Sequence, residues 1–325
     1  MNSTRIDGTL INGIACNYLS IYDRAIHYGD GLFETVLCRK KPCSEAMLYY
    51  WQRHYQRLQT SAQKLKMDCP DERLLLDDIA TLLEQMHQDE NDQKASTQSY
   101  VIKIIVTRGT GERGYLFPDK NDINRIVSCT PLATDYSSLL TETLLSGELT
   151  VCQQQVSINE QLAGLKHLNR LDNVMARNEW NKQGYSGHRS RNNNFIDGLM
   201  LNADGFVIEG SMSNVFAVRG DEIITPALTR SGVRGVMRDV IIDIAKIMGL
   251  SLVVRDMTLA EIYTMDEIFI SNSLIGLKSV TGLSAGNNAA GNNGNPQQRV
   301  LSRNSITQKI FDEIIRTTDT YAINL

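Results

Sequence analysis

The spacing of apolar residues changes at Trp51, and this change constrains the fold more than any other feature of the sequence. Residues 9–50 form short apolar runs separated by glycine, proline and polar residues, a pattern typical of strands and turns. From Trp51 onward the apolar residues are three and four positions apart, which predicts an amphipathic helix. The helical stripe comprises Leu48, Trp51, Tyr55, Leu58, Ala62 and Leu65.

The rest of the chain continues this mixture without a regular strand–helix–strand alternation. A strand over Tyr100–Thr107 contains Lys103, and hairpin-like strands lie between residues 197 and 225. A strong helix is predicted to begin at Ser231 and to stop at Gly249. This irregular order favours an α+β fold over a doubly wound sheet.

At 325 residues the chain is too long for one ordinary core, so two domains are expected. We predict a small α/β N-terminal domain over residues 1–130, a linker over 131–138 and a larger domain over 139–325. Two polar, asparagine-rich segments, Ser186–Asn194 and Gly286–Gln298, are expected to be surface loops.

Composition excludes several classes of function. With 42% hydrophobic and 22% charged residues the chain is typical of soluble globular proteins. Its net charge of −4 gives no basic footprint, so we expect neither nucleic acid nor a membrane surface as a partner. No apolar run approaches the ~18 residues of a membrane span. The six cysteines show no Cys-x-x-Cys pairing, which argues against a structural zinc site. We expect a cytoplasmic protein that binds no metal.

Lys166 is the first candidate catalytic residue, because leucines flank it within residues 163–171. An ammonium group held among apolar groups is pushed toward its neutral form, and a neutral amine is the nucleophile that forms Schiff bases. The commoner arrangement is a lysine that lies along an apolar surface with its charge in water. Lys278 also lies beside an apolar run after a glycine, so the local pattern alone does not decide between the two lysines.

A glycine-rich segment at residues 109–114, Gly-Thr-Gly-Glu-Arg-Gly, fits the dinucleotide fingerprint G-x-G-x-x-G after a strand. The fingerprint requires a helix directly after its last glycine, because the helix N-terminus holds the pyrophosphate. Residues 115–118, Tyr-Leu-Phe-Pro, instead predict a loop. The nicotinamide interpretation is therefore rejected.

An anion-binding site is expected where Arg230–Gly235 leads into the predicted helix. Unpaired backbone N–H groups and the helix dipole favour an anion at a helix N-terminus, and glycine allows close approach. In the alternative, Ser231 is an ordinary N-cap and Arg234 a solvated residue of the first turn. Arg57 is a second candidate phosphate ligand, three residues after His54 on the same helix face.

Two further candidate groups stand at strand ends. Glu209 ends an apolar strand, where its carboxylate is either a solvated turn residue or the partner of a protonated ring nitrogen. Ser271 and Ser273 follow the apolar run Glu267–Ile270 and are placed to supply hydroxyl groups.

Taken in order, these residues resemble the class IV aminotransferases, which are fold-type-IV pyridoxal-phosphate (PLP) enzymes. The resemblance covers nearly the whole chain, from Tyr22–Glu34 to the strand before Ser271. Its most specific blocks are Asp204-Gly205-x-Val207-x-Glu209-Gly210, Ser213-Asn214-Val215-Phe216, Thr225-Pro226 and Ser231-Gly232-Val233. The resemblance implies a two-domain α+β enzyme, a barrel-like sheet in the larger domain, and a homodimer.

The resemblance also implies a role for each matched position. Lys166 would carry the PLP cofactor and move protons, and Glu209 would keep the pyridine nitrogen protonated. The cofactor phosphate would be held by Arg57, the amides of Val233 and Arg234, and Ser273, with Asn272 nearby. Arg113 and Tyr115 would face a substrate carboxylate.

Within the family, the segments Lys166–Leu171 and Thr107–Tyr115 favour an elimination over a transamination. The resemblance then implies a carbon–oxygen lyase that acts on a small-molecule substrate. The alternative is a transaminase of D-amino or branched-chain amino acids, although such enzymes often have a tyrosine close after the lysine segment. A catalytically lapsed PLP-binding protein is a third possibility, and the presence of Lys166, Glu209 and Arg57 together argues against it.

Overall fold

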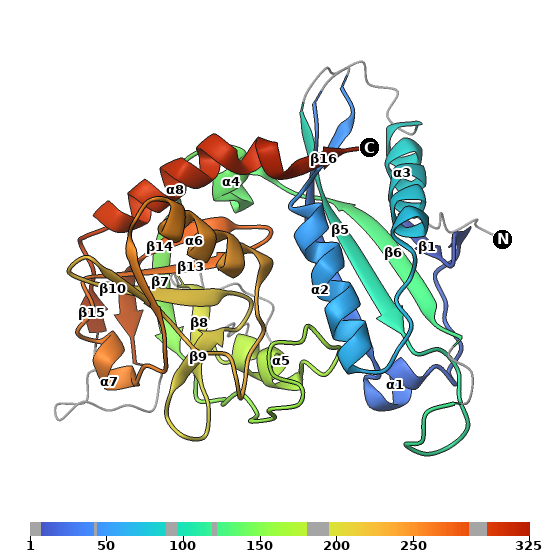
Figure 1. Cartoon of the computed structure of the whole chain (residues 1–325), viewed down its shortest axis with the longest axis horizontal. Coiled ribbons are helices and arrows are strands. Elements are labelled where there is room, and N and C mark those ends of the chain that lie inside the picture. The colour runs from blue at the N-terminus through green and yellow to red at the C-terminus, as the bar shows by residue number, and fades with distance from the viewer. Residues whose placement is uncertain (1–7, 42–43, 89–96, 119–121, 181–194, 286–297) are drawn as a thin grey trace, which may run out of the picture. The chain divides into compact units, whose positions relative to one another are not determined.

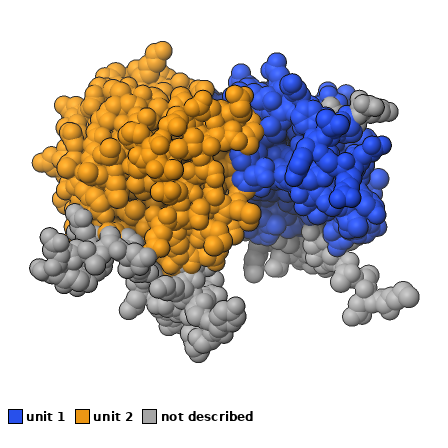
Figure 2. Space-filling model, turned by 90° about the horizontal axis from the view of Figure 1, so that it is seen from below, with its two compact units in different colours: residues 1–136, 166–169, 317–325 blue, residues 137–165, 170–316 orange. Residues whose placement is uncertain are grey.

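The computed structural model describes residues 8–41, 44–88, 97–118, 122–180, 195–285 and 298–325. The predicted loop Ser186–Asn194 lies outside these residues, as does Gly286–Gln298 apart from its last residue. The chain divides into two compact units, shown in Figure 2. Unit 1 comprises residues 1–136, 166–169 and 317–325, and unit 2 comprises residues 137–165 and 170–316.

The boundary at residue 136 falls within the predicted linker 131–138, but the division differs from the predicted one in two places. The C-terminal residues 317–325 belong to unit 1, because their strand pairs with a strand of that unit. Residues 166–169 also group with unit 1, although the chain on both sides of them belongs to unit 2.

Unit 1 contains a seven-stranded sheet in which the described strands all pair antiparallel. Its strand order is β16-β4-β3-β5-β6-β1-β2. The strands are β1 (Thr9–Ile11), β2 (Ile14–Ala15), β3 (Gly31–Lys40), β4 (Ala46–Tyr49), β5 (Gln98–Thr107), β6 (Asn124–Pro131) and β16 (Ala322–Asn324). The long central pair β3 and β5 is in register from Gly31 opposite Thr107 to Lys40 opposite Gln98.

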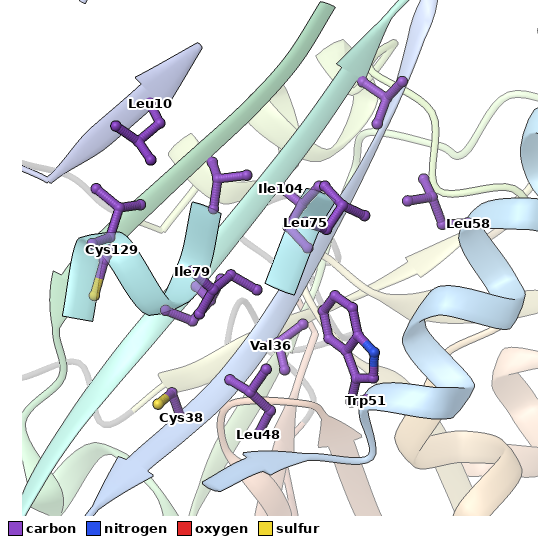
Figure 3. Close-up of a cluster of buried hydrophobic side chains, with 14 of the residues drawn as sticks. Leu10, Val36, Cys38, Leu48, Trp51, Leu58, Leu75, Ile79, Ile104 and Cys129 are labelled. Carbon is purple, nitrogen blue, oxygen red and sulfur yellow. The ribbon is translucent and has the colours of Figure 1, made fainter. Parts of the chain in front are cut away.

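The helices of unit 1 are α1 (Arg24–Tyr28), α2 (Trp51–Lys64) and α3 (Glu72–Gln88), with short 3₁₀ turns η1 (Thr134–Tyr136) and η2 (Thr318–Tyr321). Helices α2 and α3 pack on one face of the sheet. Trp51 of α2 and Leu75 of α3 pack with Val36 of β3 and Ile104 of β5 in one buried cluster, shown in Figure 3. The change of apolar period at Trp51 is thus confirmed as the point where strand β4 gives way to helix α2.

Unit 2 contains a nine-stranded mixed sheet that curls strongly (Figure 1). Its order is β12-β11-β10-β13-β14-β7-β8-β9, with β15 paired to β14. The strands are β7 (Ser146–Val151), β8 (Phe195–Leu201), β9 (Val207–Gly210), β10 (Asn214–Arg219), β11 (Glu222–Thr225), β12 (Ser251–Val254), β13 (Glu267–Asn272), β14 (Gly276–Ser284) and β15 (Gln298–Val300). The predicted α+β class, with one sheet in each half of the fold, is confirmed.

The helices of unit 2 are α4 (Ser138–Thr141), α5 (Leu171–Asn178), α6 (Val236–Ile247), α7 (Leu259–Ile262) and α8 (Ser305–Thr317). Helix α8 is held at its start by the buried carboxylate of Glu267 on β13. This carboxylate accepts the backbone N–H groups of Ile306 and Thr307 at 3.1 and 2.9 Å. A negative charge at a helix N-terminus stabilises the helix dipole.

Candidate active site

Lys166 lies in a segment that runs beside the start of β3. The Phe33 N–H donates to the carbonyl of Lys166 at 2.9 Å, and the Leu168 N–H donates to the carbonyl of Gly31 at 3.0 Å. The lysine is half-buried, and its Nζ lies 4.3 Å from the centroid of the Phe33 ring. Helix α5 begins five residues later, so Lys166 lies in the irregular segment that precedes this helix.

Lys103 on β5 is a second lysine beside the same ring. Its Nζ lies 3.7 Å from the Phe33 centroid. Burial lowers the pKa of Lys103 to about 8, although the charge of Glu34 opposes that shift. The sequence placed Lys103 within a strand but gave no signal for its role.

Arg57 and His54, which the sequence placed on one helix face, both bind Glu34 of β3. The Nε and Nη2 groups of Arg57 donate to the two carboxylate oxygens of Glu34 at 2.8 and 2.5 Å. Nδ1 of His54 lies 2.7 Å from Oε2 of Glu34. Glu34 and His54 are only 2% and 1% exposed. No local sequence pattern indicates a role for Glu34, because its partners lie 20 and 23 residues away in the chain.

The charges of this cluster are set by its neighbours. Burial raises the pKa of Glu34, but the charge of Arg57 and the hydrogen bonds from His54 and Arg57 outweigh burial and hold that pKa at about 2. Burial lowers the pKa of His54, as do the charges of Arg57 and Lys166, while the bond to Glu34 opposes them. Glu34 is therefore ionised and His54 neutral near pH 7, and the hydrogen on Nδ1 is donated to Glu34.

Glu209 is one of the buried carboxylates of unit 2. It lies on β9, is 3% exposed, and its Oε2 accepts the backbone N–H of Val233 at 2.8 Å. Its negative charge raises the pKa of Arg170 against the larger lowering effect of burial. Of the two interpretations offered for Glu209, the solvated turn residue is wrong, because the side chain is withdrawn from water.

The segment Ser231–Gly235 forms an irregular loop, and the prediction that Ser231 begins the helix is wrong. Helix α6 begins at Val236 with Gly235 as N-cap, and Ser231 is buried in the loop before it. Gly232 has φ +83°, a left-handed conformation that an α-helix cannot contain. The loop is fixed to Gly164, whose N–H donates to the carbonyl of Gly232 at 2.9 Å and whose carbonyl accepts the Arg234 N–H at 3.1 Å.

Several features of unit 2 fit a phosphorylated ring cofactor. The hydroxyl groups of Ser231 and Ser271 are buried and have no hydrogen-bond partner within the described part of the chain. A Cβ on Gly232 would lie 2.7 Å from Ile208 Cγ2 and 3.2 Å from Glu209 Oε2, so the backbone approaches the carboxylate closely. Unpartnered buried hydroxyls suit a ligand with acceptor oxygens, and a buried carboxylate suits a protonated nitrogen.

The remaining predicted cofactor ligands are engaged within the protein. The amides of Val233 and Arg234 already donate to Glu209 and Gly164, so a phosphate would have to replace those bonds. The Asn272 side chain closes the turn after β13, accepting the N–H of Leu274 at 2.9 Å. These roles, and that of the half-buried Ser273, remain predictions.

The glycine-rich segment joins β5 to β6, and the described residues directly after its last glycine, 115–118, form no helix. Its carbonyl at Gly114 accepts from Arg24 at 3.1 Å, and its N–H there donates to the hydroxyl of Tyr28 at 3.2 Å. Arg113 and Tyr115 are exposed. Side chains of α1 thus hold the loop, and its two candidate substrate residues project into solvent.

Across the described ranges, His, Cys, Asp and Glu form no group of three that suits a metal ion. Likewise, no described helix combines the length and apolar character needed to cross a bilayer.

Known proteins resemble this chain over most of its length. The family model "Amino-transferase class IV" matches residues 31–283. The chain is 32% identical over 278 residues to aminodeoxychorismate lyase of Vibrio harveyi, covering 86% of this chain and 92% of that one. It is 29% identical over 255 residues to a putative branched-chain-amino-acid aminotransferase of Methanocaldococcus jannaschii, covering 78% and 79%. The structure of 4-amino-4-deoxychorismate lyase from Pseudomonas aeruginosa is similar with a TM-score of 0.75 and 30% identity, over 96% of this chain and 99% of that chain.

Proposed function

The chain belongs to the amino-transferase class IV family, and on this premise we propose that it is a PLP-dependent lyase converting 4-amino-4-deoxychorismate to 4-aminobenzoate and pyruvate. The observation that carries the proposal is its similarity to two aminodeoxychorismate lyases over most of the chain. The product 4-aminobenzoate is a folate precursor, which assigns the protein to folate biosynthesis.

The cofactor roles follow the residues described above. Bound PLP would supply an electron-withdrawing ring that stabilises negative charge on the substrate carbon. Glu209 would hold a proton on the ring nitrogen, since a buried carboxylate favours a cationic partner. Arg57, the Val233 and Arg234 amides and Ser273 would hold the phosphate, and Lys166 would bind the aldehyde carbon covalently.

Lys166 would act as the base of the reaction. In its neutral form the amine of Lys166 would remove the proton on the amine-bearing carbon of the substrate. The bond from the neighbouring substrate carbon to the enolpyruvyl oxygen then breaks, and the ring of the substrate becomes aromatic. The departing enolpyruvate gains one proton and leaves as pyruvate, so the atoms balance without an oxidant or a keto acid.

Arg113 and Tyr115 would bind a substrate carboxylate. A planar guanidinium is able to donate two parallel hydrogen bonds to a carboxylate, and the tyrosine hydroxyl adds a third donor. Arg24 and Tyr28, which hold the loop backbone at Gly114, would fix the position of both side chains.

A transaminase is the second candidate, because the chain is also similar to a putative branched-chain-amino-acid aminotransferase. The two candidates differ in their need for an amino-group acceptor. Purified protein loaded with PLP is given aminodeoxychorismate without any keto acid, and 4-aminobenzoate and pyruvate are assayed. Equimolar products support the lyase, an absolute need for a keto acid supports the transaminase, and inactivity in both assays contradicts both.

Lys166→Ala is expected to abolish this activity and the covalent retention of PLP after borohydride reduction, because no other amine is proposed to bond to the aldehyde. Lys278→Ala is the matched control, since Lys278 shares the local sequence pattern and is expected to leave both properties intact. Mass spectrometry of the reduced protein gives the readout. Loss of the PLP mass in the Lys278 variant instead would reverse the assignment.

The resemblance also implies a homodimer. Sedimentation equilibrium of the purified chain is expected to give twice the monomer mass of 36.4 kDa.

A further inference from the structure

Glu34 accepts more side-chain hydrogen bonds than its own burial requires. Arg57 alone would neutralise its charge and satisfy both oxygens, at 2.8 and 2.5 Å. His54 adds a third donor, with its Nδ1 2.7 Å from Oε2 of Glu34. Its imidazole is desolvated for this bond, because His54 is only 1% exposed. A carboxylate with three donors in fixed directions has one orientation, and its orientation determines that of its partners.

The consequence falls on the guanidinium of Arg57. A guanidinium is planar, and its Nε–Nη2 edge faces Glu34, so Glu34 also determines the direction of the remaining N–H groups of Arg57. An arginine held in this way loses little side-chain freedom when it binds a ligand. The side chain of Arg57 is 13% exposed, whereas that of Glu34 is 2% exposed.

We infer that Glu34 and His54 are positioning residues that orient Arg57 toward the phosphate of the cofactor, His54 by fixing Glu34 and Glu34 by fixing the guanidinium. This inference rests on the proposed function, in which Arg57 binds that phosphate. Neither Glu34 nor His54 touches the cofactor in this role.

Glu34 has a second effect on Arg57, which acts against phosphate binding and so makes the inference testable. A carboxylate also neutralises the charge of Arg57 and so weakens its attraction for a phosphate. If Glu34 only compensates charge, Glu34→Gln strengthens phosphate binding or leaves it unchanged. If Glu34 orients Arg57, the same substitution weakens phosphate binding, because an amide offers Arg57 one acceptor oxygen in place of two.

The experiment compares PLP with pyridoxal, which lacks the phosphate. Both are titrated into the apoprotein and into its variants, and dissociation constants are measured by absorbance. Glu34→Gln is expected to weaken PLP binding about tenfold and to change pyridoxal binding less than about twofold. Equal weakening of both ligands, or tighter PLP binding, would overturn the inference.

Asp78→Asn is the matched control for loss of a buried ion pair in the same unit. Asp78 binds Arg125 at 2.7 Å, with side chains 6% and 17% exposed. The variant is expected to unfold at a lower temperature but to keep the wild-type preference for PLP over pyridoxal. An equal loss of that preference would show that any broken ion pair in unit 1 has the effect.

Two substitutions test whether His54 fixes the orientation of Glu34, and neither alters a formal charge near neutral pH. His54→Asn keeps an N–H donor near the position of Nδ1 and is expected to bind PLP within about threefold of wild type. His54→Leu removes the donor and is expected to bind PLP about fivefold more weakly, with pyridoxal binding unchanged. Equal PLP affinities of the two variants would overturn the role of His54. This comparison remains informative even if Glu34→Gln does not fold.

Arg57→Ala separates this inference from the proposed function. If wild type binds PLP and Arg57→Ala loses the preference for PLP over pyridoxal while Glu34→Gln keeps it, only the positioning role fails. If Arg57→Ala keeps the preference, the assignment of Arg57 as the phosphate ligand fails, and the positioning role fails with it. If wild type binds no PLP, the proposed function itself fails.

Discussion

Glu34 in unit 1 and Glu209 in unit 2 are both buried glutamates on strands, with exposed fractions of 2% and 3%, but they are held by different kinds of partner. Glu34 is bound by the side chains of Arg57 and His54. Glu209 accepts a backbone N–H from Val233, in a loop whose shape depends on a glycine at φ +83°. The two carboxylates thus differ in that Glu34 accepts from two side chains and Glu209 from a backbone N–H.

The difference predicts which substitutions each region tolerates. The cluster around Glu34 depends on charge and donor positions, so isosteric changes of charge should disturb it most. The loop around Glu209 depends on close backbone approach, so adding a single methyl group should disturb it most.

The largest effect is expected from Glu209→Gln. An amide has nearly the shape of the carboxylate, but it cannot stabilise a proton on the cofactor ring, so kcat should fall by about a hundredfold or more while the fold is retained. Steady-state kinetics at saturating substrate measure this. Glu267→Gln is the control, because Glu267 is an equally buried glutamate whose carboxylate caps α8. It should lower stability without changing kcat; an equal fall in kcat would mean that burial, and not a cofactor contact, explains Glu209.

An intermediate effect is expected from Gly232→Ala. The left-handed backbone costs an alanine roughly 1–2 kcal/mol, and the contact with Ile208 at 2.7 Å adds roughly 1–3 kcal/mol. Gly205→Ala is the control that measures the backbone cost alone, because Gly205 has φ +81° and no atom within 4 Å of the position of an added Cβ. Urea unfolding of both variants should show the larger loss of stability for Gly232→Ala. Equal losses would mean that the loop relaxes freely and that close approach to Glu209 is unimportant.

The smallest effect is expected from Lys103→Met, which removes a cation near Glu34 and replaces it with an uncharged side chain of similar volume. The pKa of Lys103 is about 8 in the folded protein and 10.5 as the ordinary value, so folding disfavours its charge. Wild-type stability is therefore reduced below pH 8 and recovers as the pH rises from 8 toward 10.5. Lys103→Met should raise the apoprotein's melting temperature by about 2–4 °C at pH 7, and the difference should shrink at pH 10. A difference independent of pH would contradict this account.

Local sequence patterns predicted those features that depend on nearby residues. The spacing after Trp51 predicted α2, which runs from Trp51 to Lys64, and the apolar run Tyr100–Thr107 predicted β5. The loop after Gly114 was predicted from the absence of a helix signal. These succeed because period and turn chemistry act over a few residues.

Features that depend on distant partners were not predicted. Ser231 has the side chain of an N-cap, but the bonds between Gly164 and Gly232 hold it in a loop and delay α6 to Val236. Glu34 is an unremarkable strand residue until α2 places His54 and Arg57 against it. The C-terminal strand belongs to unit 1 because β16 pairs with β4, some 270 residues earlier, and no local pattern reports such a pairing.

By itself the sequence determined the α+β class, the family, and the set of residues that carries a PLP-type chemistry, because each is encoded in residue type and short-range order. Only the tertiary structure decided how those residues are held. It showed that Arg57 is bound to Glu34, that Val233 donates to Glu209, and that residues 166–169 group with unit 1 between two stretches of unit 2. The reason is that hydrogen bonds and burial depend on which distant strands and helices meet, and the chain must fold before those partners exist.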